Sequence, residues 1–341
     1  MVVETLQGWP IKINPKSLGL PQAFFSLLYS CKGGYMRKYY RIESGRIVPA
    51  SDEESADIVM MSAPSPEQRG TLIKEYELTE HTIASAFDND ELSRIEYDDD
   101  FTTIVFKKPK NYAASDNFQF RVESFGVFLF NDWVLLLTDS EIPLQDERRF
   151  SRIDSLNTVV LKLLNYSIFH FNEHLKIISR INDELEQKLR TAMENKYLLS
   201  MFSLNKGLIY YVSALNSNDT LLKKLQLGRS LNFSELEREL LDDIIIENRQ
   251  SLQQAEIYAN ILTSMMDARA SVINNNVNSL MKTLNAITIA LMVPTFVASI
   301  FGMNVEFPFS LGVSNPYSFW IIMGIAILSV IIFMFFWQSK K

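Results

Sequence analysis

The stretch LNAITIALMVPTFVASIF, residues 284–301, contains 18 residues and no charged side chain. A second stretch, FWIIMGIAILSVIIFMFFW at residues 319–337, contains 19 residues that are apolar except for one glycine and one serine. A helix of 19 residues is roughly 28 Å long, about the thickness of the hydrocarbon core of a bilayer. Trp320 and Trp337 lie near the ends of the second stretch, where interfacial aromatic residues are expected. The sequence therefore predicts two transmembrane helices rather than two buried core helices.

The charges that flank these two stretches predict their orientation. Lys282 precedes the first stretch, Lys340 and Lys341 follow the second, and the segment 302–318 between them contains no lysine or arginine. Because basic residues accumulate on the cytoplasmic side of membranes, both termini are expected in the cytoplasm and the segment 302–318 outside the cell membrane. The three lysines would form a basic ring at the cytosolic membrane face, followed by a short tail at residues 338–341. The outer segment carries one charge, Glu306, and would not repel a cation.

The composition and net charge of the 341-residue chain indicate which kinds of partner it can bind. Hydrophobic residues make up 47% and charged residues 21%, a mixture that indicates a soluble body joined to membrane-embedded segments. The net charge of −7 disfavours nucleic acid, because phosphate binding needs a basic face, and favours cations. The single cysteine, Cys31, excludes an internal disulfide and a cysteine-cluster metal site. The N-terminus lacks the pattern of a signal peptide, so we expect the soluble body to stay in the cytoplasm.

Residues 1–150 have the pattern of a mixed α/β domain. Ser65 is a candidate N-cap and Pro66 fits the first position of a helix that follows it. Four stretches have strand character, and the last two form a hairpin: residues 56–64, 102–109, 119–130 and 133–139. We therefore expect a sheet with helices packed against it.

Residues 151–283 are predicted to form a helical stalk. One helix begins near residue 156 and a second covers residues 202–226. The third begins near residue 233, and the segment 234–293 contains 60 residues without glycine or proline. A continuous helix of that length is roughly 90 Å long and becomes the first transmembrane span without a break. Since no domain of this size can bury it, we expect it to pack against copies of itself. Two capping boxes are possible at its start: Asn232 with Glu235, or Ser234 with Glu237.

One face of this long helix carries a polar or methionine side chain at every position, at offsets that alternate between four and three residues. The positions are Asp267, Ser271, Asn274, Asn278, Met281, Asn285, Thr288, Met292, Thr295 and Ser299. This spacing keeps one face near 3.5 residues per turn. Polar side chains in a bilayer face a bundle interior or water rather than lipid. Small hydroxyls and amides also serve as helix–helix contacts in membranes, but an unbroken run of this length favours a pore lining.

Two spans per chain cannot enclose a pore, so several copies are expected around a common axis. Rings of asparagine, threonine and serine supply neutral oxygens for a cation that keeps its hydration shell, and Mg²⁺ loses water reluctantly. Met292, with Met281 and Leu284, would form apolar constrictions that close by dewetting. An enzyme is not expected, because three histidines and one cysteine form no recognisable catalytic motif.

The stretch MMDARASVINNNVNSLMKTLNAITIALMVPTFVASIFGMN, residues 265–304, resembles the CorA family of magnesium and divalent-cation transporters. It ends in Gly-Met-Asn at residues 302–304 with a second span following, and it contains the N-x-x-M-K pattern at 278–282 and Pro-Thr-Phe-x-Ala at 294–298. The resemblance covers the layout of almost the whole chain. It implies a funnel-shaped homopentamer in the cell membrane, with an α/β cytoplasmic domain, a long helical stalk and two transmembrane helices.

The same resemblance implies roles for residues of the ion pathway. Asn304 would form the outer ring that captures a hydrated cation, and Gly302 and Met303 would shape the turn that presents it. Positions that match the family's pore lining are Asn278, Leu284, Thr288, Met292 and Thr295, and Asp267 matches an acidic position near the cytosolic mouth. The outer segment departs from many family members, because Glu306 is its only acid.

The family is also regulated by cytosolic Mg²⁺ bound between neighbouring subunits by carboxylates. Asp243 matches one of those acids, and its partner is expected to be Asp88, Asp90 or Glu91 in the sequence FDNDEL. A solvated surface is an equally good interpretation of this second acidic stretch.

These features predict channel-like influx of Mg²⁺ driven by the membrane potential. A divalent ion gains roughly 4.6 kcal/mol per 100 mV of inside-negative potential, and the chain contains no GxxxxGK[ST] phosphate-binding loop. Cytosolic Mg²⁺ between subunits would keep the pore closed. One alternative is another divalent ion, Co²⁺, Ni²⁺ or Zn²⁺, since His170 and His174 flank Glu173 at a helical spacing that can bind a transition metal; a plain surface pair is the favoured interpretation of these histidines. The other alternative is a membrane-anchored Mg²⁺ sensor that does not conduct.

Overall fold

The computed structural model describes residues 36–112, 118–191, 195–228, 231–303 and 317–339. The chain divides into two compact units, Met1–Ser264 and Met265–Lys341, and each is described by itself. Four of the candidate site residues lie outside the described ranges: Asn304, Glu306, Lys340 and Lys341.

The first unit contains a seven-stranded sheet with the order β2-β1-β3-β7-β6-β5-β4. The strands are β1 Met36–Glu43, β2 Arg46–Pro49, β3 Ile58–Ser62, β4 Arg94–Tyr97, β5 Thr102–Pro109, β6 Val122–Leu129 and β7 Val134–Thr138. The central pair β3 and β7 is parallel, and the other neighbouring pairs are antiparallel. The expected hairpin is therefore confirmed as β6 and β7, and β5 has the bounds that the sequence predicted.

The strands β1, β2 and β4, toward the two edges of the sheet, were not predicted from the sequence, because their composition is not that of a buried strand. β1 contains Arg37, Lys38 and Arg41 among its aromatic residues, and it reverses into β2 through a two-residue turn. Ser44 and Gly45 in that turn have φ values of 51° and 76°. Two positive φ values in a two-residue hairpin turn are typical of type I′, which follows the twist of the strands it joins.

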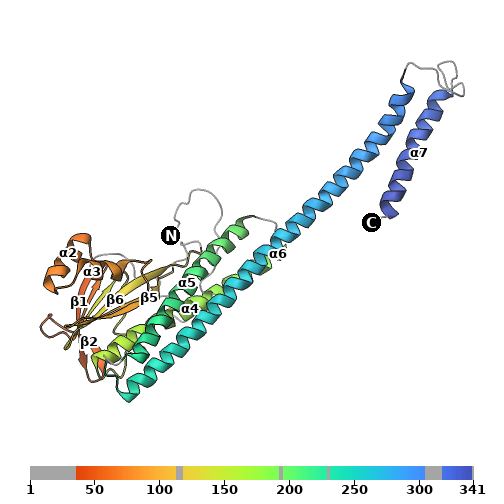
Figure 1. Cartoon of the computed structure of the whole chain (residues 1–341). Coiled ribbons are helices and arrows are strands. Elements are labelled where there is room, and N and C mark those ends of the chain that lie inside the picture. The colour runs from red at the N-terminus through yellow and green to blue at the C-terminus, as the bar shows by residue number, and fades with distance from the viewer. Residues whose placement is uncertain (1–35, 113–117, 192–194, 229–230, 304–316, 340–341) are drawn as a thin grey trace, which may run out of the picture. The chain divides into compact units, whose positions relative to one another are not determined.

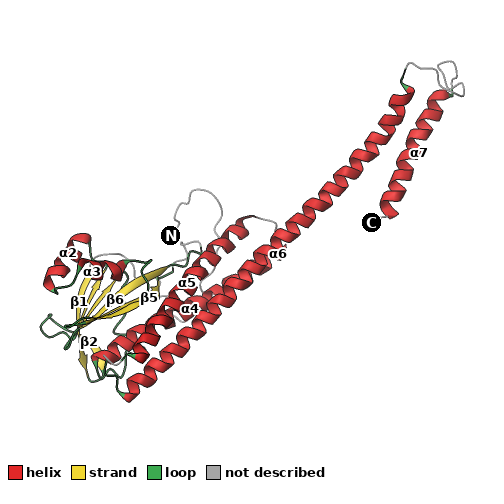
Figure 2. Ribbon diagram, in the orientation of Figure 1, coloured by secondary structure: helices red, strands yellow, loops and turns green. Residues whose placement is uncertain are grey.

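Helices cover both faces of the sheet, as Figures 1 and 2 show. On one face lie α2, Pro66–Glu75, and α3, Glu80–Phe87. The predicted cap of α2 is confirmed, since Ser65 and Gln68 form a capping box. The helix α3 was not predicted, and it approaches β6 closely: a Cβ atom at Gly126 would lie 2.6 Å from the Cβ of Ala86. Glycine at this position therefore permits the contact.

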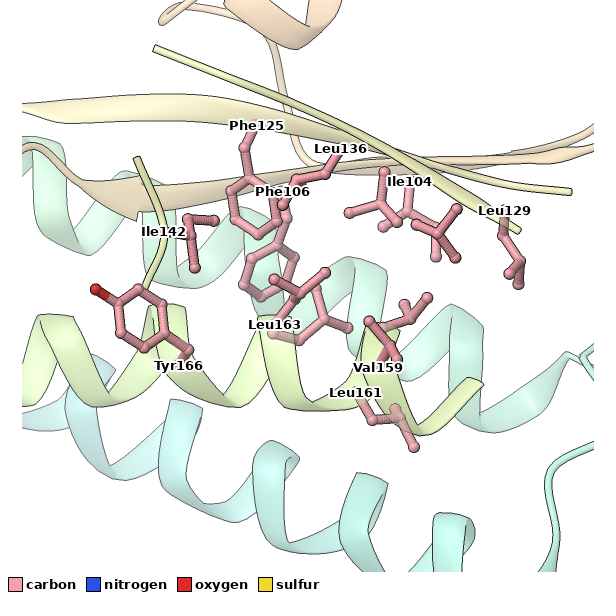
Figure 3. Close-up of a cluster of buried hydrophobic side chains, with 14 of the residues drawn as sticks. Ile104, Phe106, Phe125, Leu129, Leu136, Ile142, Val159, Leu161, Leu163 and Tyr166 are labelled. Atoms are coloured by element: carbon pink, nitrogen blue, oxygen red, sulfur yellow. The ribbon is translucent and has the colours of Figure 1, made fainter. Parts of the chain in front are cut away.

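The larger core lies on the other face, under α4, Leu156–Thr191, α5, Asn195–Leu227, and the beginning of α6, Glu235–Phe301. Alternate residues of the strands point into it, as period-2 geometry requires. Figure 3 shows part of this core, in which Phe106, Phe125 and Leu136 of the sheet face Leu163 of α4. Burying each such side chain contributes roughly 1.5–3 kcal/mol to stability.

The long helix expected from the sequence is confirmed as α6, whose 67 residues run through Pro294. Of the two possible capping boxes, Ser234 with Glu237 is formed, with the Ser234 backbone N–H donating to Glu237 Oε2 at 2.8 Å. The helix α5 begins at Asn195, earlier than the predicted residue 202.

The second unit contains the rest of α6 and α7, Ser318–Ser339. By length and composition α6 includes a segment that can cross a membrane, and none of that segment is buried within the chain. The helix α7 contains a shorter apolar stretch, Phe319–Phe335. The second predicted span therefore coincides with a helix of 22 residues.

Candidate ion pathway and acidic loop

All ten positions of the predicted polar face lie on the one helix α6, and each is exposed in the single chain, as is Leu284. The residues between them are mostly exposed as well, Leu291 at 66% and Phe296 at 64% among them. Exposure therefore does not distinguish this face from the rest of the helix. Its chemistry does, because the intervening positions within the membrane segment are mainly large apolar residues.

Two threonines on this face hydrogen-bond to the helix itself. Thr288 Oγ1 donates to the carbonyl oxygen of Leu284 at 2.9 Å, and Thr295 Oγ1 donates to that of Leu291 at 2.7 Å. Since each hydroxyl has one hydrogen to donate and two lone pairs, the oxygen remains available to accept. These two oxygens can therefore receive hydrogen bonds from the water shell of a cation.

Gly302 and Met303 lie in the turn at which α6 ends. The Gly302 N–H donates to the carbonyl of Ala298 at 3.0 Å, and the Met303 N–H donates to that of Ile300 at 3.2 Å. A Cβ atom at Gly302 would meet the Ala298 oxygen at 3.4 Å, an ordinary contact. The described part of this chain therefore does not require glycine at the position, and the role of both residues in presenting Asn304 stays a prediction.

The acidic stretch at residues 88–91 forms a loop that follows α3, and a buried lysine lies beneath it. Lys107 of β5 is 4% exposed, and its Nζ donates to the carbonyl oxygens of Asp88 at 3.2 Å and Asn89 at 2.9 Å, and to Ser124 Oγ at 2.7 Å. Burial lowers the pKa of Lys107 to about 8, although the nearby acids of the loop act in the opposite direction. We call residues 88–91 the acidic loop.

The three candidate acids of the acidic loop differ in their surroundings. Asp88 Oδ1 accepts the backbone N–H of Asp90 at 2.9 Å, and Glu91 forms an ion pair with Arg94. Asp88 and Asp90 are exposed, whereas Glu91 is half-buried. Asp88 and Asp90 are therefore better placed than Glu91 to bind a cation from outside the chain.

The remaining charged candidates within the described residues lie on α6, and all are exposed. Asp243 follows Asp242, whose Oδ1 accepts a hydrogen bond from Gln226 Nε2 at 2.6 Å. Asp267 and Lys282 are exposed farther along the helix. Among the residues that the structure describes, no group of three or more His, Cys, Asp and Glu side chains could hold a metal ion.

The histidine pair on α4 is not the surface pair that was favoured from the sequence. His174 is 2% exposed, and its Nδ1 lies 2.5 Å from the hydroxyl oxygen of Tyr211 on α5. The ring centroids of His170 and His174 are 4.5 Å apart. Glu173 Oε1, between them in the sequence, forms an ion pair with Lys176 Nζ at 2.7 Å. Burial lowers the pKa of His174 to about 3. His174 is thus part of the packing between α4 and α5, and the half-buried His170 packs against it on α4.

Comparison with known proteins identifies the family. Residues 53–341 match the CorA-like Mg²⁺ transporter proteins. The chain belongs to this family. The cobalt/magnesium transport protein CorA of Methanocaldococcus jannaschii is 26% identical over 289 residues, covering 81% of this chain and 88% of that protein. A magnesium transport protein CorA of Campylobacter jejuni is 29% identical over 98 residues, covering 28% of this chain and 29% of that protein.

The fold agrees with this assignment. The complete structure of the CorA magnesium transporter from M. jannaschii matches with a TM-score of 0.75 and 21% identity, covering 91% of this chain and 99% of that chain. The predicted layout of an α/β domain, a long helix and C-terminal apolar helices is thereby confirmed. As a CorA-family member, the protein is a membrane protein of the divalent-cation transporter class.

The sequence did not identify Lys107 as a residue of interest, nor Asn218, which hydrogen-bonds its backbone. The available signal was the pair of lysines in TTIVFKKP, a strand that is otherwise apolar at its centre. Adjacent residues of a strand point to opposite faces. Two lysines in a strand covered on both faces therefore indicate that each has a specific buried partner.

Proposed function

We propose that this CorA-family protein is a homopentamer in the cell membrane that conducts Mg²⁺ into the cytoplasm, driven by the membrane potential. Both termini would lie in the cytoplasm, with Lys282, Lys340 and Lys341 at the inner membrane face. The polar face of α6 is the observation that carries the proposal. Transport without catalysis accords with family membership.

The spacing of this face supports a bundle of wound helices. An ideal straight α-helix drifts by roughly 20° per heptad against a 3.5-residue repeat, or roughly 80° over the four heptads from Asp267 to Thr295. Helices that wind around one another with a left-handed twist remove this drift and keep such a face on the common axis. Five copies would then present rings of Asn274, Asn278, Asn285, Thr288, Thr295 and Ser299 to the ion.

The donor chemistry of the rings supports a hydrated cation as the substrate. The hydroxyl hydrogens of Thr288 and Thr295 are bonded to backbone carbonyls of the helix. The lone pairs of these oxygens therefore remain available to accept hydrogen bonds from water. Asn304, at the outer end with Glu306 beyond it, would be the first ring that an arriving ion meets. Met281, Leu284 and Met292 would form apolar rings where the pathway closes by dewetting.

The proposed regulation uses Mg²⁺ bound between copies, by Asp243 of one and the acidic loop of the next. Exposed carboxylates are hard oxygen ligands, and Mg²⁺ commonly binds through one or two carboxylates with several waters retained. The structure favours Asp88 and Asp90 over Glu91, which is paired with Arg94. Empty sites would repel one another across the interface, whereas bound Mg²⁺ would hold the copies together with the pore closed; Asp267 would add negative charge at the cytosolic mouth.

Co²⁺ is the second candidate substrate, because the M. jannaschii relative is named a cobalt/magnesium transport protein. The histidine pair gives no support to Ni²⁺ or Zn²⁺, since His174 is buried against Tyr211. A sensor that binds Mg²⁺ without conducting would not need a membrane helix with one face that is polar or methionine at every position.

The test is cation uptake by proteoliposomes that contain the purified full-length protein, at inside-negative potential and with Mg²⁺, Co²⁺, Ni²⁺ or Zn²⁺ outside. Asn304→Ala is expected to abolish Mg²⁺ uptake, and Ser310→Ala in the same outer segment is the control. Internal Mg²⁺ is expected to inhibit the wild type. Normal uptake by Asn304→Ala would show that the pore assignment is wrong, and absence of any flux in the wild type would favour the sensor.

A further inference from the structure

The acidic loop is attached to the sheet through a buried lysine. The Lys107 ammonium donates hydrogen bonds to the backbone carbonyls of Asp88 and Asn89. Ser124 Oγ donates a further hydrogen bond to the Asp88 carbonyl at 2.5 Å. Ser124 also accepts from the same ammonium at 2.7 Å. The start of the loop is therefore held by one charged donor and one hydroxyl, both in the interior.

The backbone of the same lysine is held by helix α5. The strand β4 pairs with β5 only as far as Arg94 opposite Val105, so Lys107 lies beyond the end of its neighbour. Asn218 of α5, which is fully buried, takes the place of that neighbour. Its Oδ1 accepts the Lys107 N–H at 3.1 Å, and its Nδ2 donates to the Lys107 carbonyl at 3.0 Å. The side-chain amide thus continues the hydrogen bonding of the sheet edge.

The chain leaving the acidic loop is attached to the same helix. The Ser93 N–H donates to Ser217 Oγ at 2.6 Å, and Ser93 Oγ donates to Asn218 Oδ1 at 2.6 Å. The start of the loop is therefore held by Lys107, and the chain that leaves its end is held by Asn218. These two residues are hydrogen-bonded to each other. A methionine would fill the space of Lys107 with lower desolvation cost, but it could not hold the two loop carbonyls.

The helix α5 in turn is bonded to α6 close to Asp243. Asn248 Nδ2 of α6 donates to the Leu215 carbonyl at 3.0 Å, and Arg249 Nε lies 3.1 Å from Asp219 Oδ1. Leu215 and Asp219 lie within one helical turn of Asn218 on either side. A displacement of the acidic loop would therefore be opposed by bonds that end on α6.

We propose that Lys107 is the positioning residue of the cation-regulated loop: its buried ammonium holds Asp88 and Asp90 in the arrangement that binds a divalent cation, and its backbone ties that arrangement to α5 through Asn218. This inference rests on the proposed regulatory role of the acidic loop. Lys107 touches no cation; it acts through the loop carbonyls.

The experiment uses the full-length protein and measures the Mg²⁺ concentration that gives half-maximal protection against chymotrypsin, with flux as a second readout. Lys107→Met is expected to raise this midpoint roughly tenfold, as for loss of one charge-assisted hydrogen bond from the bound arrangement. Ser124→Ala is expected to raise it in the same direction by less, and keeps the test valid where Lys107→Met does not fold. Asp90→Ala and Asp243→Ala measure the proposed site itself.

The neighbouring lysine provides a matched control. Lys108 is 2% exposed on the same strand, but its ammonium pairs with Glu123 and Ser140 on the opposite face. Lys108→Met combined with Glu123→Gln removes an equally buried ammonium and is expected to leave the midpoint unchanged.

An unchanged midpoint in Lys107→Met overturns the inference; if Lys107→Met does not fold, an unchanged midpoint in Ser124→Ala does so instead. The proposed function still stands in that case if Asp90→Ala shifts the midpoint. An equal shift in the Lys108 control also overturns the inference, since general destabilisation would then explain the effect. If neither Asp90→Ala nor Asp243→Ala shifts the midpoint, the proposed regulation fails, and this inference fails with it.

Discussion

The two parts of helix α6 belong to one continuous helix but have opposite relations to the rest of the chain. Between Glu235 and Leu262 the helix buries a stripe that includes Leu241, Ile244 and Ile245 in the core under the sheet. From Met265 to Met303 no described residue is buried, although this is the more apolar part. The first part therefore packs against other elements of the same chain. The second part requires partners outside the chain, which are lipid in a membrane protein and, in the proposed homopentamer, further copies.

Polar side chains show the same difference. In the first part, Ser251 Oγ donates to Asn172 Oδ1 of α4 at 2.6 Å, and Asn248 bonds the backbone of α5. In the second part, Thr288 and Thr295 bond the helix that carries them. A polar group that is paired only with its own backbone is free to contact water, an ion or another copy. Pairing with α4 or α5 thus marks polar residues that stabilise the fold, and the spacing along α6 must then select which of the others face the proposed pathway.

The largest expected effect on stability comes from truncating the buried stripe. Ile244 is fully buried, whereas Leu291 in the second part is 66% exposed. Ile244→Ala is expected to lower the unfolding free energy of the first unit by about 3 kcal/mol, since Ile-to-Ala changes in cores leave a cavity. Leu291→Ala is expected to lower it by less than about 0.5 kcal/mol, as for exposed positions. Thermal unfolding of the full-length protein in detergent measures both, and equal losses would contradict the comparison.

Lowering the pH is expected to reduce the folding stability of the first unit alone, because all three histidines precede residue 264. Burial lowers the pKa of His174 to about 3, and burial together with His174 and Lys108 lowers that of His170 well below its usual value. The unfolded chain binds these protons near pH 6.5 and the folded chain does not. Stability is therefore complete above about pH 6.5 and falls as the pH is lowered toward 3; at pH 5 His174 alone accounts for about 2 kcal/mol.

Hydrogen exchange between pH 7 and pH 5, corrected for the intrinsic rate, can locate this loss. Amides of α4 and α5 are expected to lose protection while those of α7 do not. His174→Gln should remove much of the pH dependence, and His81→Gln, at an exposed position, should not. A pH response of equal size in α7 would show that the histidine pair is not its source.

The same contrast explains which features the sequence could predict. The helix α6, its Ser234 cap and its polar face are repeated or local patterns, so reading along the chain found them. The hydrogen bonds between the Asn218 side chain and the Lys107 backbone join residues 111 positions apart, and no local pattern specifies that pairing. β1 and β4 were missed because they carry charged residues whose partners lie in other parts of the fold. Arg37 pairs with Glu53, and Arg94 donates to Ser85 Oγ of α3 at 3.0 Å. The histidine pair was misjudged for a related reason, since Tyr211 of another helix packs against His174.

The smallest expected effect tests the second part of α6 directly, through its threonines. Thr288 lies on the polar face, and Thr283 lies off it, yet both hydroxyls donate to a carbonyl one turn earlier, at 2.9 Å and 3.0 Å. Thr288→Val keeps the shape and removes the oxygen, so Mg²⁺ flux in proteoliposomes is expected to fall roughly tenfold, about 1.4 kcal/mol, which is the scale of one hydrogen bond. Thr283→Val makes the same chemical change and should leave flux within about twofold, because in the proposed pore its oxygen would not face the ion. Equal flux in the two variants would mean that the face defined by the spacing is not the face that the ion passes.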